Sequence, residues 1–108
     1  MPSFGDFTKL TGRSGAVYAF SIASRNQRFF AKPGVYVMAK DMGGDRYEFC
    51  YVGETADMSV RPFAPEKQDC FRSFGVDCIF HLEEFDASKR RSAVSDLVEA
   101  YSPRCNAL

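Results

Sequence analysis

The sequence predicts a small α/β domain of the α+β kind, in which helices flank a central antiparallel β-sheet. Two segments rich in aromatic and β-branched residues lie on either side of a glycine turn, which is typical of a β-hairpin. A longer amphipathic segment near the C-terminus indicates a helix that packs on this sheet. The chain has 108 residues, 45% of them hydrophobic, which allows one modest core and no second domain.

The N-terminal part of this single domain, residues 1–108, is expected to begin with a loose lead-in over residues 1–12. Residues 16–22 are expected to form the first strand, because aromatic and β-branched side chains dominate this stretch after Gly15. No linker, repeat or low-complexity tract interrupts the chain, so we place no domain boundary within it.

The predicted hairpin follows Pro33 and Gly34, where proline and glycine interrupt the pattern. Residues 35–39 form its first strand and residues 47–52 its second. Residues 41–45 supply the glycines that a tight loop needs for positive φ angles.

The middle of the chain has a mixed pattern in which we expect short helical pieces. A short helix is predicted over residues 58–61, a break over residues 62–65 because of two prolines, and a helical turn over residues 67–74. Residues 76–82, with apolar side chains at alternate positions, are predicted to form another strand.

The last predicted element is a helix that begins after Asp86, a good N-cap residue, and ends before Pro103. Arg90 and Arg91 are expected on its solvated face. Its apolar stripe contains Ala93, Val94, Leu97, Val98 and Tyr101.

Two tyrosine-bearing tripeptides on the predicted hairpin form a specific combination with residues further along the chain. They are Gly34-Val35-Tyr36 and Tyr51-Val52-Gly53, and Arg61 lies eight residues after the second. The segment 94–106 adds Leu-Val, a proline and a final asparagine at matching intervals. In these residues the chain resembles the GIY-YIG nucleases, and the likeness covers residues 34–61 and 94–106.

The resemblance implies roles for five residues. Tyr36, Tyr51 and Arg61 would be catalytic: Tyr36 would activate water, Tyr51 would shape the site, and Arg61 would stabilise charge on the phosphoryl group. Gly53 and Asn106, together with Arg61, would contact phosphate or nucleic acid. A tyrosine with a pKa of about 10 is a poor base at neutral pH unless a cation lies nearby.

The chain departs from the family pattern where the metal-binding glutamate is expected, because Val94 occupies that position. Valine cannot bind Mg²⁺, so no metal ligand is assigned there. A histidine that often follows the arginine is also missing, since residues 62–65 read Pro-Phe-Ala-Pro. Glu54 is the first candidate for a substitute ligand and Asp96 the second.

The formal charge of zero gives no general attraction to nucleic acid. Residues 1–33 carry five basic side chains and one acidic one, 5 − 1 = +4, whereas residues 34–70 carry four and seven, 4 − 7 = −3. The basic N-terminal strip is consistent with nucleic-acid contact and equally with a solvated strand face. The neutral total and the 11 phenylalanines favour a protein partner instead.

The four cysteines, at positions 50, 70, 78 and 105, have only His81 to help them bind a metal, so a zinc site is not expected. His81 is interpreted as a strand residue. The chain starts without a signal-peptide pattern and has no apolar run of membrane-spanning length. We therefore expect a cytoplasmic protein with no membrane segment, whose cysteines are reduced thiols.

Three functional hypotheses follow. The preferred one is a GIY-YIG endonuclease-like domain with an impaired site that binds nucleic acid or a protein. The second is an active Mg²⁺-dependent endonuclease with a substitute ligand, and the third is a protein-binding inhibitor or accessory subunit. Whether the chain is an enzyme stays open, and no cofactor is expected except Mg²⁺ in the active case.

Overall fold

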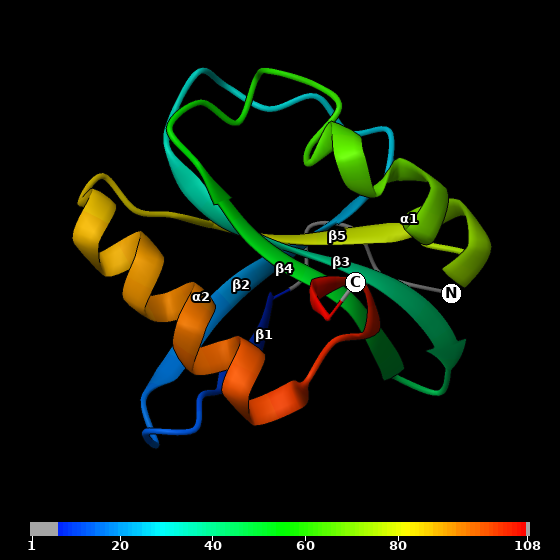
Figure 1. The fold of residues 1–108 in the computed structure, drawn as a ribbon, viewed down its shortest axis with the longest axis horizontal. Helices are drawn as coiled ribbons and strands as arrows, with labels where there is room; N and C mark the ends of the chain where they lie inside the picture. The colour runs from blue at the N-terminus through cyan, green and yellow to red at the C-terminus, as the bar shows by residue number, and fades with distance from the viewer. Residues whose placement is uncertain (1–6, 108) are drawn as a thin grey trace.

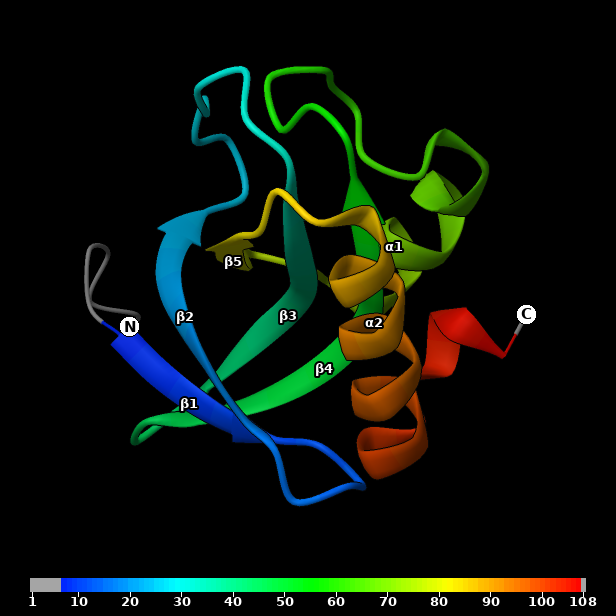
Figure 2. The same cartoon turned by 90° about the vertical axis from the view of Figure 1, so that its left-hand side faces the viewer.

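A five-stranded antiparallel sheet organises the chain, and its strands follow the order β1-β2-β5-β3-β4. The computed structural model describes residues 7–107. Figures 1 and 2 show that the sheet curls and that the two α-helices lie on different sides of it. In chain order the elements are β1 (Phe7–Thr11), β2 (Val17–Ser24), β3 (Gly34–Gly43), β4 (Arg46–Thr55), η1 (Pro65–Lys67), α1 (Gln68–Phe74), β5 (Cys78–Glu83), α2 (Ala87–Tyr101) and η2 (Arg104–Asn106).

Two clusters of buried side chains lie on the two faces of the sheet, because successive residues of a strand point to opposite faces. Val35 and Val37 of β3 join Leu97 of α2 in the first cluster. Tyr36 of β3 and Phe71 of α1 belong to the second. The domain is thus of the α+β class with a central antiparallel sheet and flanking helices, as the sequence predicts.

The predicted hairpin and the strand after α1 are confirmed. β3 pairs with β4, and β5 adds to the other side of β3, so that β3 lies between two partners. The loose lead-in is wrong for residues 7–11, which form β1 and pair with β2. Leu10 is buried in the α2-side core, which stabilises this strand. Residues 1–6 of that prediction lie outside the described residues.

The short helix predicted over residues 58–61 is wrong, since the chain makes a turn there. The Asp57 carboxylate accepts hydrogen bonds from the backbone N and hydroxyl of Ser59, at 2.9 and 2.6 Å, and so closes the turn locally. The helical turn predicted over residues 67–74 is confirmed by α1.

Helix α2 begins as predicted, with the Asp86 carboxylate accepting from the backbone N of Ser88 and Lys89. Arg91 is exposed, as expected. The prediction that Arg90 is solvated is wrong, because this side chain is buried between α2 and β4. No helix within residues 7–107 is long and apolar enough to cross a membrane.

Candidate functional site

The register of the β3–β4 hairpin brings the two motif tyrosines together. Tyr36 lies opposite Gly53, and Tyr51 lies opposite Met38, two residues along the same face. Their ring centroids are 6.2 Å apart. Gly53 makes this possible, because a Cβ atom at that position would lie 2.5 Å from Tyr36 Oη and 2.8 Å from the Tyr51 ring.

Tyr36, the predicted water-activating residue, is almost completely covered, with 3% of its surface exposed. The Phe63 ring stacks on it with a centroid separation of 4.5 Å. Burial raises the pKa of Tyr36 well above its usual value, and the nearby Tyr51, Glu66 and Glu54 raise it further. The hydroxyl is therefore protonated at neutral pH, which makes it a poor base.

A hollow of about 350 Å³ beside β4 brings together several of the residues that the resemblance singles out. Tyr51, Gly53 and Glu54 line it from β4, while Val94 lines it from α2 and Asn106 from η2. Tyr36 lies against Gly53 and Tyr51 on the α1 side of the sheet. Arg61 lines a different hollow.

Glu54, the first candidate metal ligand, is partly exposed and forms an ion pair with the buried Arg90. Arg90 Nε donates to Glu54 Oε1 at 2.7 Å. Arg90 Nη1 also donates to the carbonyl oxygens of Glu84 and Phe85, both at 3.1 Å, and these bonds fix the guanidinium. Glu54 thus already has a cation that neutralises its charge.

Asp96, the second candidate, holds the β1–β2 hairpin against α2. Its carboxylate accepts from the Ser14 backbone N and hydroxyl, at 2.8 and 2.7 Å, and from Tyr18 Oη at 2.8 Å. The Ser14 and Tyr18 hydrogen bonds lower the pKa of Asp96. Asp96 therefore points to a different part of the molecule from the β4 hollow.

These residues do not fit a divalent metal. The expected ligand position holds Val94, and the only carboxylate among the described residues that line the β4 hollow is the paired Glu54. Within residues 7–107, no three His, Cys, Asp or Glu side chains are grouped closely enough to hold an ion.

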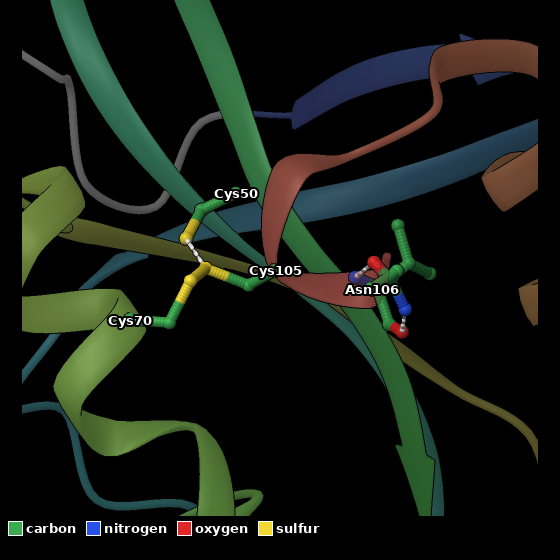
Figure 3. The surroundings of a disulfide bond; sticks show 5 residues. Cys50, Cys70, Cys105 and Asn106 are labelled. Carbon is green, nitrogen blue, oxygen red and sulfur yellow. Dashed lines mark hydrogen bonds between the residues drawn. A yellow bond between two sulfur atoms is a disulfide. The ribbon is translucent and has the colours of Figure 1, made fainter. Parts of the chain in front are cut away.

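Asn106 uses its side chain to hold η2 against β4. The amide Oδ1 accepts from Val52 N at 2.8 Å, and Nδ2 donates to Val52 O at 2.9 Å (Figure 3). Both polar atoms of the predicted phosphate-contacting side chain are thus bonded to the backbone.

Arg61 lies beside the loop between β2 and β3, in a hollow of about 660 Å³. Its guanidinium donates to the carbonyl oxygens of Gln27 and Arg25, at 2.8 and 2.6 Å, and lies 4.5 Å above the Phe63 ring. Burial and the neighbouring Arg25 lower the pKa of Arg61. Arg28 lines the same hollow, so cations converge there.

The cysteines correct the sequence-based expectation in part. Cys70 and Cys105 form a disulfide, so the prediction of reduced thiols is wrong for this pair. Cys50 and Cys78 are free and buried, as predicted. Figure 3 shows the bond joining α1 to η2, with the Cys50 sulfur beside it.

No family model, curated protein or solved structure matches this chain. The chemistry of the site is therefore inferred from its geometry. Phe63, which joins Arg61 to Tyr36 through ring contacts, was noted in the sequence only as a replacement for an expected histidine.

His81 lies on β5, where the sequence placed it. Its ring contacts the edge of Phe29 with a centroid separation of 4.7 Å. Burial lowers its pKa, so the imidazole is neutral at pH 7.

Proposed function

We propose that the chain is a GIY-YIG-like domain that does not cleave nucleic acid and instead binds its phosphate backbone through the cations around Arg61. The order of hairpin, helix, strand and helix supports the relationship, as does the pairing of Tyr36 and Tyr51 across Gly53. We infer the loss of cleavage from the β4 hollow, which offers no free carboxylate among its described residues to bind a metal. Val94 replaces the expected ligand, and Glu54 is neutralised by Arg90.

The proposed binding surface is the loop between β2 and β3 with Arg61. Arg25, Arg28 and Arg61 have no carboxylate partner among the described residues, so their charge is available to an anion. Phe30 in the same loop is 85% exposed. An exposed aromatic ring in the same loop as Arg25 and Arg28 suits a nucleic-acid strand, since bases stack on aromatic rings while cations contact phosphates.

The first test measures binding of the purified protein to single- and double-stranded DNA and RNA as the salt concentration increases. Contact with phosphates predicts binding that weakens steeply with salt. Arg61→Ala should reduce the affinity. Arg91→Ala, which changes an exposed arginine at the β4 hollow, is the matched control and should leave it unchanged.

Two results would contradict this proposal. Binding lost in Arg91→Ala and kept in Arg61→Ala would move the interface to the β4 hollow. No salt-sensitive binding to any nucleic acid would favour the protein-binding inhibitor or accessory subunit.

The second test measures cleavage of the same nucleic acids with Mg²⁺ or Mn²⁺. We expect none from the natural sequence, and Val94→Glu should create or raise activity if the remaining residues are competent. Cleavage by the natural sequence that is lost in Tyr36→Phe would support the alternative, an active endonuclease with a substitute ligand.

The Cys70–Cys105 disulfide also bears on where the protein works. Disulfides persist in oxidising compartments and are rare in the cytosol, so we propose an oxidising location in place of the cytoplasm that the sequence suggested. Alkylation of the protein in its native cells, followed by mass spectrometry, tests this proposal. Recovery of Cys70 and Cys105 as alkylated thiols would contradict it.

A further inference from the structure

Three sulfur atoms meet between the sheet, α1 and η2. Cys105 is bonded to Cys70, and the Cys50 Sγ lies 3.2 Å from the Cys105 Sγ (Figure 3). The fourth cysteine, Cys78, is apart from this group, and its thiol faces the Ala39 carbonyl oxygen. A free thiol in contact with a disulfide sulfur is the arrangement from which thiol–disulfide exchange proceeds.

A β-bulge in β4 directs the Cys50 side chain toward the Cys70–Cys105 disulfide. Met38 pairs with Tyr51 and Ala39 pairs with Phe49, so Cys50 has no partner on β3 and is the extra residue of a β-bulge. Its side chain therefore joins the α1-side cluster, as Tyr51 does, although the two are neighbours in sequence. Bulges redirect side chains in this way and are common near functional sites.

We propose that Cys50, Cys70 and Cys105 form a thiol–disulfide exchange site, in which the disulfide moves from Cys70–Cys105 to Cys50–Cys105 and releases Cys70 as a thiol. The Cys50 thiolate attacks Cys105 Sγ, the new S–S bond forms, and the bond to Cys70 breaks. Its electron pair goes to Cys70 sulfur, which takes up a proton equivalent to the one that Cys50 lost. No external oxidant or reductant is consumed.

Burial determines which of the three cysteines an external reagent can reach. Cys50 and Cys105 are completely buried, whereas Cys70 is only half-buried on the short helix α1. The released thiol is thus the one that a small disulfide, or a disulfide of a partner protein, can reach. Cys70 is therefore the site of mixed-disulfide formation with such disulfides: its thiolate attacks one sulfur, the reagent's S–S bond breaks, and the other sulfur leaves as a thiol.

The exchange also changes which elements are crosslinked. In the described state the disulfide ties α1 to η2, whereas in the exchanged state it would tie β4 to η2. Asn106 already holds η2 against β4 through its hydrogen bond to Val52. Helix α1 would lose its covalent attachment to the C-terminal segment. Burial raises the pKa of Cys50 to about 11, with Arg104 opposing that shift, so the thiolate is scarce at neutral pH and the exchange is slow.

The first test uses the full chain with Cys70→Ser under mild oxidation, followed by alkylation and peptide mapping. We expect a Cys50–Cys105 disulfide in the folded variant. Recovery of both residues as alkylated thiols would overturn the proposal. Cys78→Ser is the matched control and should retain the Cys70–Cys105 bond, since Cys78 lies outside the cluster.

The second test needs no change to the disulfide cysteines and so remains decisive if Cys70→Ser does not fold. The folded natural sequence is incubated with an alkylating reagent and mapped without reduction. We expect alkylated Cys70 together with a Cys50–Cys105 disulfide, and labelling of Cys70 about tenfold slower in Cys50→Ala. Unchanged labelling in Cys50→Ala, or no labelled Cys70 in the natural sequence, would overturn the proposal.

Discussion

Two hollows of the molecule, one beside β4 and one beside Arg61, differ in the charges that line them. The hollow beside β4 contains Tyr51, Gly53 and Asn106 from the family pattern, but its carboxylate is bound to Arg90 and its asparagine to the backbone. The hollow beside Arg61 holds few residues of the pattern, yet the arginines there have no carboxylate partner within residues 7–107. The β4 hollow thus presents one exposed arginine, Arg91, whereas the Arg61 hollow presents two, Arg28 and Arg61.

The strongest way to break this contrast is to remove the cation that pairs with Glu54. Arg90→Ala removes a buried guanidinium with its hydrogen bonds to Glu54 and to two backbone carbonyl oxygens, so we expect a loss of about 3 kcal/mol in the free energy of unfolding. Urea denaturation measures it. Arg91→Ala, one residue along the same helix and exposed, should change the value by less than about 0.5 kcal/mol. Equal effects would show that the pair does not stabilise the fold.

A methyl group at the floor of the same hollow should have the next largest effect. Gly53→Ala places a Cβ 2.5 Å from Tyr36 Oη, so we expect a loss of about 2 kcal/mol in unfolding free energy from overpacking. Combining it with Tyr36→Leu removes the two closest atoms, Tyr36 Oη and Cζ, which lie at 2.5 and 2.6 Å. The double variant should therefore lose less than the sum of the two single losses, and strict additivity would contradict the clash.

Burial of Tyr36 should make the free energy of unfolding depend on pH. The pKa of this tyrosine in the folded protein lies above the unfolded value of 10.0, so its neutral form stabilises the fold below that pH. Above pH 10.0, the unfolded chain binds fewer protons than the folded chain does. The free energy of unfolding should therefore fall by about 1.4 kcal/mol per pH unit for this group. Denaturation curves measured at increasing alkaline pH test this slope, which should become shallower in Tyr36→Phe.

The smallest expected effect concerns the arginine hollow. If Arg28 contacts one phosphate, Arg28→Ala should lower affinity similarly for all nucleic-acid sequences and make the logarithmic salt slope shallower by about 1. Arg28 is preferable to Arg61 here, because the Arg61 side chain also holds the loop through two carbonyl oxygens. An unchanged slope would place the contact elsewhere.

The sequence predicted those parts of the fold that depend on neighbouring residues. The hairpin followed from the glycine turn, and the start of α2 followed from Asp86, whose carboxylate caps it. β1 was missed because its stability depends on the burial of Leu10 beneath distant elements. A five-residue strand with one buried residue has little local pattern to detect.

The site depends more on contacts between distant residues, and less of it could be predicted. Arg90 is 36 residues from Glu54, so no helical pattern could indicate that its charge is buried. The disulfide joins cysteines 35 positions apart, and spacing alone does not determine pairing. The proximity of Tyr36 and Tyr51 was foreseeable because it required only the hairpin register.

The attachment of Asn106 to Val52 has a consequence for association between molecules. β4 is an edge strand, and such strands expose backbone groups on which other chains can add a strand. By bonding to both the N and O of Val52, the amide occupies the place of a neighbouring strand at that residue. The C-terminal segment therefore blocks strand addition at Val52, and a chain shortened before Pro103 would expose these two backbone groups.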